Sequence, residues 1–154
     1  MKNTQIYKSE ISDTRWIVYD LPGNVGWIAY IAALIIVFAK KPAFLDAPLV
    51  SISMIVGILP AIAMLVGIVE LISERIQKLD RVLPKARLYR GFGALTWGGF
   101  GGVIVGLTGL FAAMRVGFSV NECAALVWMA AGGALCAVFA GLIFKTFHPQ
   151  RRDV

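Results

Sequence analysis

Few reactive side chains of this sequence stand near an apolar segment, and the strongest candidate among them is Glu70. It is the acidic residue nearest to the interior of a long uncharged stretch. Ionisable groups are costly in a membrane interior and are functional candidates by default, here for a proton or cation site. Glu70 nevertheless ends its stretch, one turn before Glu74 and close to Arg75, where a side chain reaches water or lipid headgroups. A functional role and a surface role therefore both stay open.

The cysteines and the histidine predict no reactive centre. Cys123 and Cys136 fall on largely different faces of a helix, and the sequence has no Cys-x-x-Cys motif of thiol redox enzymes. The only histidine, His148, follows the last apolar stretch, so one chain cannot build an intramembrane histidine site for haem or metal. No hydroxyl and carboxylate residues form a recognisable nucleophile and base pair. We predict no catalytic residue, no metal site and no cofactor.

Four stretches without charged residues are each long enough, at about 20 residues, to cross a bilayer. The composition agrees, because 58% of the residues are hydrophobic and only 16% are charged, against about a quarter in soluble domains. We predict an all-α integral membrane protein with a bundle of four transmembrane helices. The expected parts are an interfacial tail at 1–20, a transmembrane domain at 21–146 with spans at about 21–39, 47–72, 91–114 and 120–144, and a C-terminal tail at 147–154.

The net charge of +6 does not predict nucleic-acid binding, because the basic residues are sorted by side of the membrane. All of them except Lys40, Lys41 and Arg115 lie on one side if the spans alternate in direction. The positive-inside rule then places both termini in the cytoplasm, for a bacterial protein at the inner membrane. The connection after the second span holds a basic group: Arg75, Lys78, Arg81, Lys85, Arg87 and Arg90. It is either a helix end resting on headgroups of the bilayer or a docking site for a cytoplasmic partner.

The second stretch contains a proline that predicts a kink near the middle of the membrane. Pro60 removes one backbone hydrogen bond and clashes with the carbonyl of Val56, while Gly57 lies on the same turn. Such kinks occur at transport sites, and membrane helices also tolerate proline for packing alone. At the start of this helix we expect Asp46 to be the N-cap, with Pro48 in the first turn.

Two further local patterns concern the ends of helices. Ser119 and Glu122 have the spacing of a capping box, in which the hydroxyl and the carboxylate each bond the other residue's amide. Trp27 and Tyr30 are amphipathic rings of the kind that prefers the membrane interface, and we expect them at that level.

Small residues recur at helical spacing in the last two stretches and predict close helix packing. Without side chains, two helices approach until their backbones touch, and such contacts drive association in lipid. The third stretch carries Gly98, Gly102, Gly106 and Gly109, and the fourth carries Gly133, Ala137 and Gly141. The connection from Arg115 to Phe118 is short, so we expect these two spans to form an antiparallel, glycine-rich hairpin. No strand or P-loop lysine accompanies the glycines, which excludes a nucleotide loop.

Two kinds of function fit these features. The first is a non-catalytic assembly or accessory subunit that packs, through its glycine-rich faces, against copies of itself or against a larger membrane protein. The second is a small homo-oligomeric transporter or channel, in which Pro60, Thr96, Thr108 and Glu70 line or gate the path. A polar stripe shared by several spans would favour transport, and the spans are mostly apolar. A lipid-modifying or thioether-forming membrane enzyme is a third reading that lacks a visible catalytic set.

Overall fold

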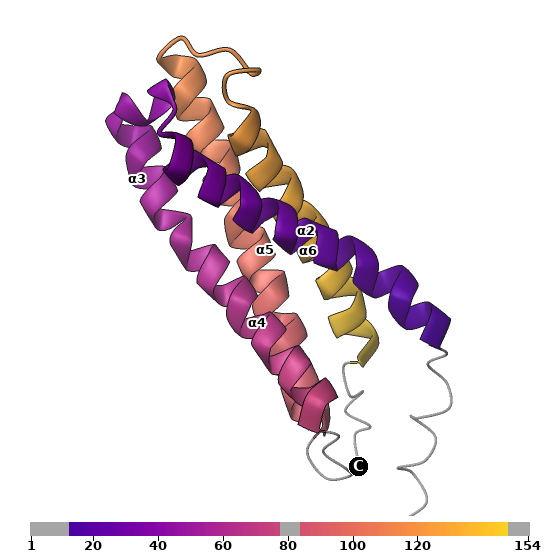
Figure 1. The fold of residues 1–154 in the computed structure, drawn as a ribbon. Coiled ribbons are helices and arrows are strands. Elements are labelled where there is room, and N and C mark those ends of the chain that lie inside the picture. Colours follow the sequence, from indigo (N-terminus) through magenta and orange to yellow (C-terminus); the bar gives the residue numbers. More distant parts are fainter. Residues whose placement is uncertain (1–12, 78–83, 148–154) are drawn as a thin grey trace, which may run out of the picture.

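The computed structural model describes residues 13–77 and 84–147, and helices make up almost all of both ranges (Figure 1). The prediction of an all-α fold is confirmed there, with no strand in either range. The elements are α2 (Asp13–Lys40), the 3-10 helix η1 (Ala43–Asp46), α3 (Pro48–Val56), α4 (Ile58–Gln77), α5 (Pro84–Arg115) and α6 (Ala124–Phe147). Thus α2 begins inside the segment expected as a tail, while residues 1–12 and 148–154 of the two expected tails lie outside the described ranges.

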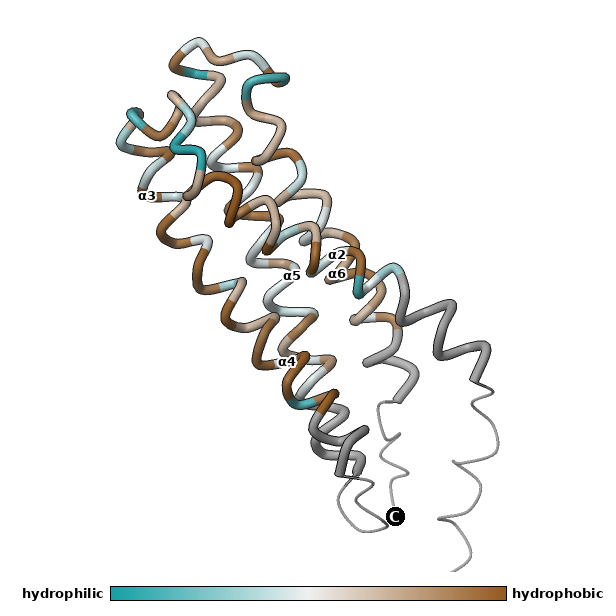
Figure 2. The backbone as a smooth tube through the Cα atoms, in the orientation of Figure 1, coloured by the Kyte–Doolittle hydropathy of each residue, from teal (hydrophilic) through white to brown (hydrophobic). Residues whose placement is uncertain are grey.

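Four helical segments are long and apolar enough to cross a membrane, in agreement with the four predicted spans. They are Pro22–Lys40, Pro48–Ile72, Gly91–Arg115 and Ala124–Leu142. Hydrophilic residues gather at the connections beside η1 and before α6, while α3 and α4 are hydrophobic along most of their length (Figure 2). Large apolar side chains also face outward, such as Trp97 at 77% exposure and Leu49 at 67%. This composition suggests a multi-pass membrane protein.

The helices form an open row rather than a closed ring. α5 packs along α4 on one side and along α6 on the other, and α2 packs along α6 (Figure 1). α2 and α4 are the two ends of the row, and they make few contacts with each other. Side chains from all these helices and from η1 and α3 form the core, and its largest fully buried residues are Tyr30, Phe44, Phe92, Met54, Met64, Leu126 and Met129.

The predicted N-cap at Asp46 is wrong. Asp46 is the last residue of η1, and the N-cap of α3 is Ala47, which makes no side-chain capping bond. The chain enters α3 through the turn of η1, where the amide of Ala47 donates to the carbonyl of Phe44 at 3.2 Å. Pro48 follows at the first helical turn, where it lacks only an N–H that would be unpaired there.

The capping box before α6 is confirmed. The amide of Ser119 donates to a carboxylate oxygen of Glu122 at 2.7 Å, and the amide of Glu122 donates to the Ser119 hydroxyl oxygen at 3.4 Å. The Ser119 hydroxyl also donates to the same carboxylate, and these bonds lower the pKa of Glu122 below its usual range. These bonds close a turn that precedes the helix, and α6 itself starts at Ala124. Earlier in the same connection the chain reverses at Gly117, whose φ of 103° suits glycine.

Candidate functional site at the helix crossing

Backbone contacts hold α5 and α6 together where they cross. A Cβ atom added at Gly99 would lie 2.5 Å from the amide nitrogen of Ala137 and 2.7 Å from the carbonyl oxygen of Gly133. The reverse also holds, since a Cβ at Gly133 would lie 2.7 Å from the carbonyl oxygen of Gly99. Further along, a Cβ at Gly106 would meet the amide nitrogen of Ala130 at 2.6 Å. No side chain fits at these glycines unless the helices separate.

The same kind of contact joins α2 to α6. A Cβ at Gly26 would lie 2.6 Å from the amide nitrogen of Cys136, and one at Gly132 would lie 2.6 Å from the carbonyl oxygen of Gly26. Gly132 and Gly133 are adjacent, so α6 presents one glycine to α2 and the next to α5. We call Gly26, Gly99, Gly102, Gly132 and Gly133 the glycine crossing.

A second glycine contact lies between α4 and α5, nearer to the end where these two helices are connected. A Cβ at Gly67 would lie 2.7 Å from the carbonyl oxygen of Gly91, and one at Gly91 would lie 2.8 Å from the Leu71 side chain. All these faces meet within one chain.

The glycines predicted as one stripe on α5 face four different helices. Gly98 faces α4, where an added Cβ would lie 3.0 Å from the carbonyl oxygen of Pro60. Gly102 faces α2 and Gly106 faces α6. A Cβ added at Gly109 would lie 3.2 Å from side-chain atoms of both Met54 in α3 and Leu126 in α6.

On α6, the three predicted packing positions have unequal surroundings. Gly133 and Ala137 contact Gly99 through their backbones. Gly141 has more room, since a Cβ added there would meet the Thr96 methyl group only at 3.5 Å. Sequence reasoning missed Gly26, Gly67, Gly99 and Gly132. The doubled glycines at 98–99 and 132–133 are the available signal, because adjacent small residues let one helix approach two neighbours.

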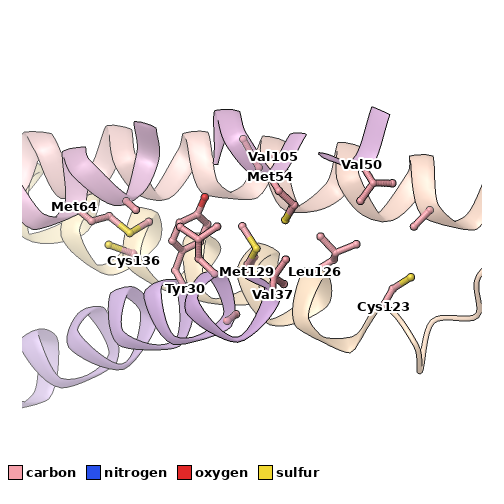
Figure 3. Close-up of a cluster of buried hydrophobic side chains, with 14 of the residues drawn as sticks. Tyr30, Val37, Val50, Met54, Met64, Val105, Cys123, Leu126, Met129 and Cys136 are labelled. Carbon is pink, nitrogen blue, oxygen red and sulfur yellow. The ribbon is translucent and has the colours of Figure 1, made fainter. Parts of the chain in front are cut away.

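Tyr30 occupies the centre of the molecule, and its predicted place at the membrane interface is wrong. Its side chain is 0% exposed, and its hydroxyl donates a hydrogen bond of 2.9 Å to the carbonyl oxygen of Gly57 (Figure 3). Its ring covers Gly102, where an added Cβ would lie 2.6 Å from a ring carbon. The ring can be buried because the hydroxyl has an acceptor and the glycine leaves space for the ring.

The acceptor of that bond lies at an interruption of the second span. α3 ends at Val56 and α4 begins at Ile58, with Gly57 between them. Pro60 has no N–H to donate to the carbonyl of Val56. The next backbone bond is long, since the Ala61 amide lies 3.5 Å from the Gly57 carbonyl oxygen. The Tyr30 hydroxyl therefore gives the Gly57 carbonyl a hydrogen-bond donor where the backbone of its own helix offers only a long bond. In an apolar environment such a carbonyl needs a donor from the protein.

The residues proposed to line a transport path have separate surroundings. Pro60 is buried against Gly101 of α5, whereas Thr108 is exposed and donates to the carbonyl of Ile104 in its own helix at 2.8 Å. Thr96 likewise donates to the carbonyl of Phe92 at 2.8 Å, and Glu70 is half-buried. The structure does not bring these four residues together within one chain.

The remaining candidates give no reactive cluster in the part of the chain that the structure describes. No group of three or more His, Cys, Asp or Glu residues that could hold a metal occurs there. Cys123 and Cys136 are buried free thiols, and the Cys136 thiol donates to the Leu95 carbonyl at 3.4 Å. Of the basic group, Arg75 lies in α4 and Lys85, Arg87 and Arg90 lie in α5, while Lys78 and Arg81 fall outside the described residues.

Comparisons of this chain with protein-family models, with curated proteins and with solved structures find no match.

Proposed function

We propose that this protein is a non-catalytic assembly or accessory subunit embedded in a membrane by four spans. One observation carries the proposal: at the glycine crossing and at Gly67 and Gly91, neighbouring helices lie so close that an added Cβ atom would come within 3 Å of an atom of the next helix. Such contacts build a compact helical unit and contribute no reactive group. In this proposal α5 and α6 form the antiparallel, glycine-rich hairpin at the centre of the subunit.

The partner would bind the outer faces of the subunit. The sequence left open whether the glycine faces pack within one chain, as in the predicted hairpin, or against other chains. In the structure they are occupied by neighbouring helices of the same chain. The outward faces instead carry large aliphatic and aromatic side chains, among them Trp97, Phe100 and Trp128. Van der Waals packing of such residues is one of the interactions that associate helices in lipid. A larger membrane protein is the proposed partner.

Native mass spectrometry of protein extracted gently from its own membrane tests this function. A larger protein in fixed stoichiometry with this chain is the expected result. A homo-oligomer without a partner would contradict it and favour the transporter or channel, and flux into liposomes, compared between the unaltered protein and Glu70→Gln, would then test proton or cation transport.

Membrane embedding and sidedness form the second part of the proposal. We propose the inner membrane with both termini in the cytoplasm, because Lys40, Lys41 and Arg115 are the only basic residues of the two opposite connections. Labelling of intact cells with a membrane-impermeant maleimide checks this in a background with both native cysteines replaced. Lys41→Cys should react and Gln150→Cys should not, and the reverse pattern would contradict the orientation.

A further inference from the structure

The second span consists of two helices that are joined at a single residue. α3 ends at Val56, Gly57 forms a turn, and α4 begins at Ile58. Pro60 lacks the N–H that would pair with the carbonyl of Val56, and the Ala61 amide reaches the Gly57 carbonyl oxygen only at 3.5 Å. Because the backbone bonds across this turn are fewer and longer than in a continuous helix, the span can bend there.

On the α4 side of the turn, backbone atoms set the distance to α5. A Cβ added at Gly98 would lie 3.0 Å both from the amide nitrogen of Met64 and from the carbonyl oxygen of Pro60. One added at Gly67 would lie 2.7 Å from the carbonyl oxygen of Gly91. Such contacts cannot adjust unless a whole helix shifts, so α4 is the fixed half of the second span.

On the α3 side of the turn, side chains form the contacts with α5. A Cβ added at Gly109 would meet the terminal methyl group of Met54 at 3.2 Å and the Cβ of Ser53 at 3.6 Å. A methionine side chain has several rotatable bonds and can keep its contacts while its helix shifts. α3 makes few contacts with α4 and still fewer with α2. It is therefore the adaptable half of the second span.

η1 belongs to the same half as α3. The Ser51 hydroxyl of α3 donates to the carbonyl of Leu45, and the Ala47 amide between the two helices donates to the carbonyl of Phe44. Toward the connection before α6, the Phe44 ring meets the Phe118 ring edge-on. That contact is again between side chains, so η1 and α3 form one unit that side chains hold in place.

A side chain of another helix is bonded at the turn between the two halves. The Tyr30 hydroxyl of α2 donates to the Gly57 carbonyl oxygen at 2.9 Å, and both residues are buried (Figure 3). α2 is itself fixed on α6 by the backbone contacts of Gly26 and Gly132. The bond therefore ties the point where the second span can bend to a closely packed pair of helices.

We propose that Gly57 is a hinge about which α3 and η1 move as one unit, and that the Tyr30 hydrogen bond holds this hinge closed. Hinges are often a few residues at the ends of elements, where backbone angles can change. The moving unit carries exposed apolar side chains at Leu49, Ile52 and Ile55, so the hinge changes the position of one outer face. A molecule that binds this face in only one position would shift the population of the two states. The inference is independent of the accessory role.

Distances between spin labels, measured by pulsed electron paramagnetic resonance on the full chain in nanodiscs, test the hinge in a background without the two native cysteines. The pair Ile52→Cys with Val138→Cys reports the position of α3 relative to α6. The matched pair Val69→Cys with Val127→Cys reports the position of α4 relative to α6. All four positions are exposed, so the labels need not disturb the core. Each pair should give one dominant distance while Tyr30 is present.

Tyr30→Phe should raise the population of a second distance about fivefold in the α3 pair, the scale of one hydrogen bond, and leave the α4 pair unchanged. Thr108→Val is the control, because it removes a hydroxyl from an exposed position of α5 and should change neither pair. An unchanged α3 pair in Tyr30→Phe, or an equal change in both pairs, would overturn the hinge.

A rescue variant locates the bend. Pro60→Ala, added to Tyr30→Phe, restores an amide donor for the carbonyl of Val56 and should reduce the second distance of the α3 pair again. A second distance that persists unchanged would contradict a hinge at this turn.

A measurement on the unaltered protein covers a failure of the tyrosine variant to fold. Relaxation dispersion of backbone amides in bicelles detects motions on the microsecond to millisecond scale, which includes hinge motions. We expect such exchange at residues 43–57 and not at residues 64–71, where α4 contacts the glycines of α5. Exchange that is absent from residues 43–57, or equal in both segments, would overturn the proposal.

Discussion

The glycine crossing and the core beside η1 are packed in opposite ways. At the crossing, backbone atoms of α2, α5 and α6 set the distance between helices, and an added methyl group would lie within 3 Å of a neighbour. In the core beside η1, side chains fill the space between helices instead, and they are at most 2% exposed: Phe44, Val50, Met54, Leu126 and Met129. The ring of Phe44 meets that of Phe118 edge-on at 6.4 Å between centroids.

The difference decides which region tolerates change. A methionine side chain has several rotatable bonds and adapts to its neighbours, so the core beside η1 can adjust to a substitution. Backbone atoms cannot move without shifting a whole helix, so the glycine crossing cannot adjust. Tyr30 combines both kinds of packing. Its ring fills space as a core side chain does, and it leaves no room for a side chain at Gly102.

The largest effect is expected for Gly99→Ala. The added methyl carbon would lie 2.5 Å from a backbone nitrogen of α6, so the helices must separate, at a cost of about 3 kcal/mol or more. Thermal unfolding in detergent, followed by fluorescence-detected size exclusion, measures the loss. Gly141→Ala is the matched control, since its methyl group would meet only Thr96 at 3.5 Å and should leave the unfolding temperature nearly unchanged. Equal stability of the two variants would contradict the close backbone contact between α5 and α6 at Gly99.

Gly102→Ala tests whether the crossing and the tyrosine depend on each other. Its methyl carbon would lie 2.6 Å from the Tyr30 ring, and we expect a loss of about 2 kcal/mol from overpacking. In a background with Tyr30→Leu the ring is absent, so the same substitution should cost much less. A double-mutant cycle on unfolding in SDS measures this coupling, and additive losses would show that the two residues do not interact.

Tyr30→Phe removes only the hydroxyl and should cost about 1 kcal/mol, the usual scale of one hydrogen bond in a membrane protein. The Gly57 carbonyl would keep only the long bond from Ala61. Thr108→Val is the control, because it also removes one hydroxyl, but from an exposed position where the acceptors belong to its own helix. The same unfolding assay applies, and a larger loss for the threonine variant would contradict the role of Tyr30.

Met54→Leu probes the adaptable side of the comparison. The two side chains have similar volume, so we expect a loss of about 0.5 kcal/mol, well below that of any change at the glycine crossing. The unfolding temperatures of this variant and of Gly99→Ala, measured in the same assay, provide the comparison. A loss as large as that of the glycine variant would mean that the core beside η1 is as rigid as the crossing.

The smallest effect concerns the turn before α6. Because the Ser119 bonds lower the pKa of Glu122, its charge stabilises the folded turn above about pH 4.3, the ordinary value for glutamate. That contribution is lost as the pH falls through the lowered pKa. Unfolding temperatures measured from pH 6 to pH 3 should fall slightly more for the unaltered protein than for Glu122→Gln. Identical pH profiles would show that the capping box contributes nothing.

Local features of this fold could be predicted from the sequence. The four spans follow from the absence of charge over about 20 residues, and the Ser119 and Glu122 box follows from spacing along one short segment. Neither depends on which helices are neighbours. Pro48 is similar, because its preference for a first helical turn is a property of its own ring.

Features that depend on helix order could not be predicted. A periodic pattern gives the angle of Gly98 and Gly102 around α5 but not which helix each one faces. Tyr30 was misplaced because an amphipathic ring suits an interface as well as a core that offers an acceptor, and the acceptor at Gly57 is distant in sequence. The prediction for Asp46 is wrong because this residue is the last one of the 3-10 helix η1, which lies just before α3.

An engineered disulfide between α2 and α6 tests most directly whether the glycine faces close within one chain. A Cβ added at Gly23 would lie 3.8 Å from that of Phe139, the mean separation of about 3.8 Å in disulfides. Gly23→Cys with Phe139→Cys, in a background with Cys123→Ala and Cys136→Ala, is oxidised in the membrane and run on a non-reducing gel. We predict an internally bridged monomer with two hydrogens lost by mass. A covalent dimer would contradict the account, because α2 would then pack on another copy.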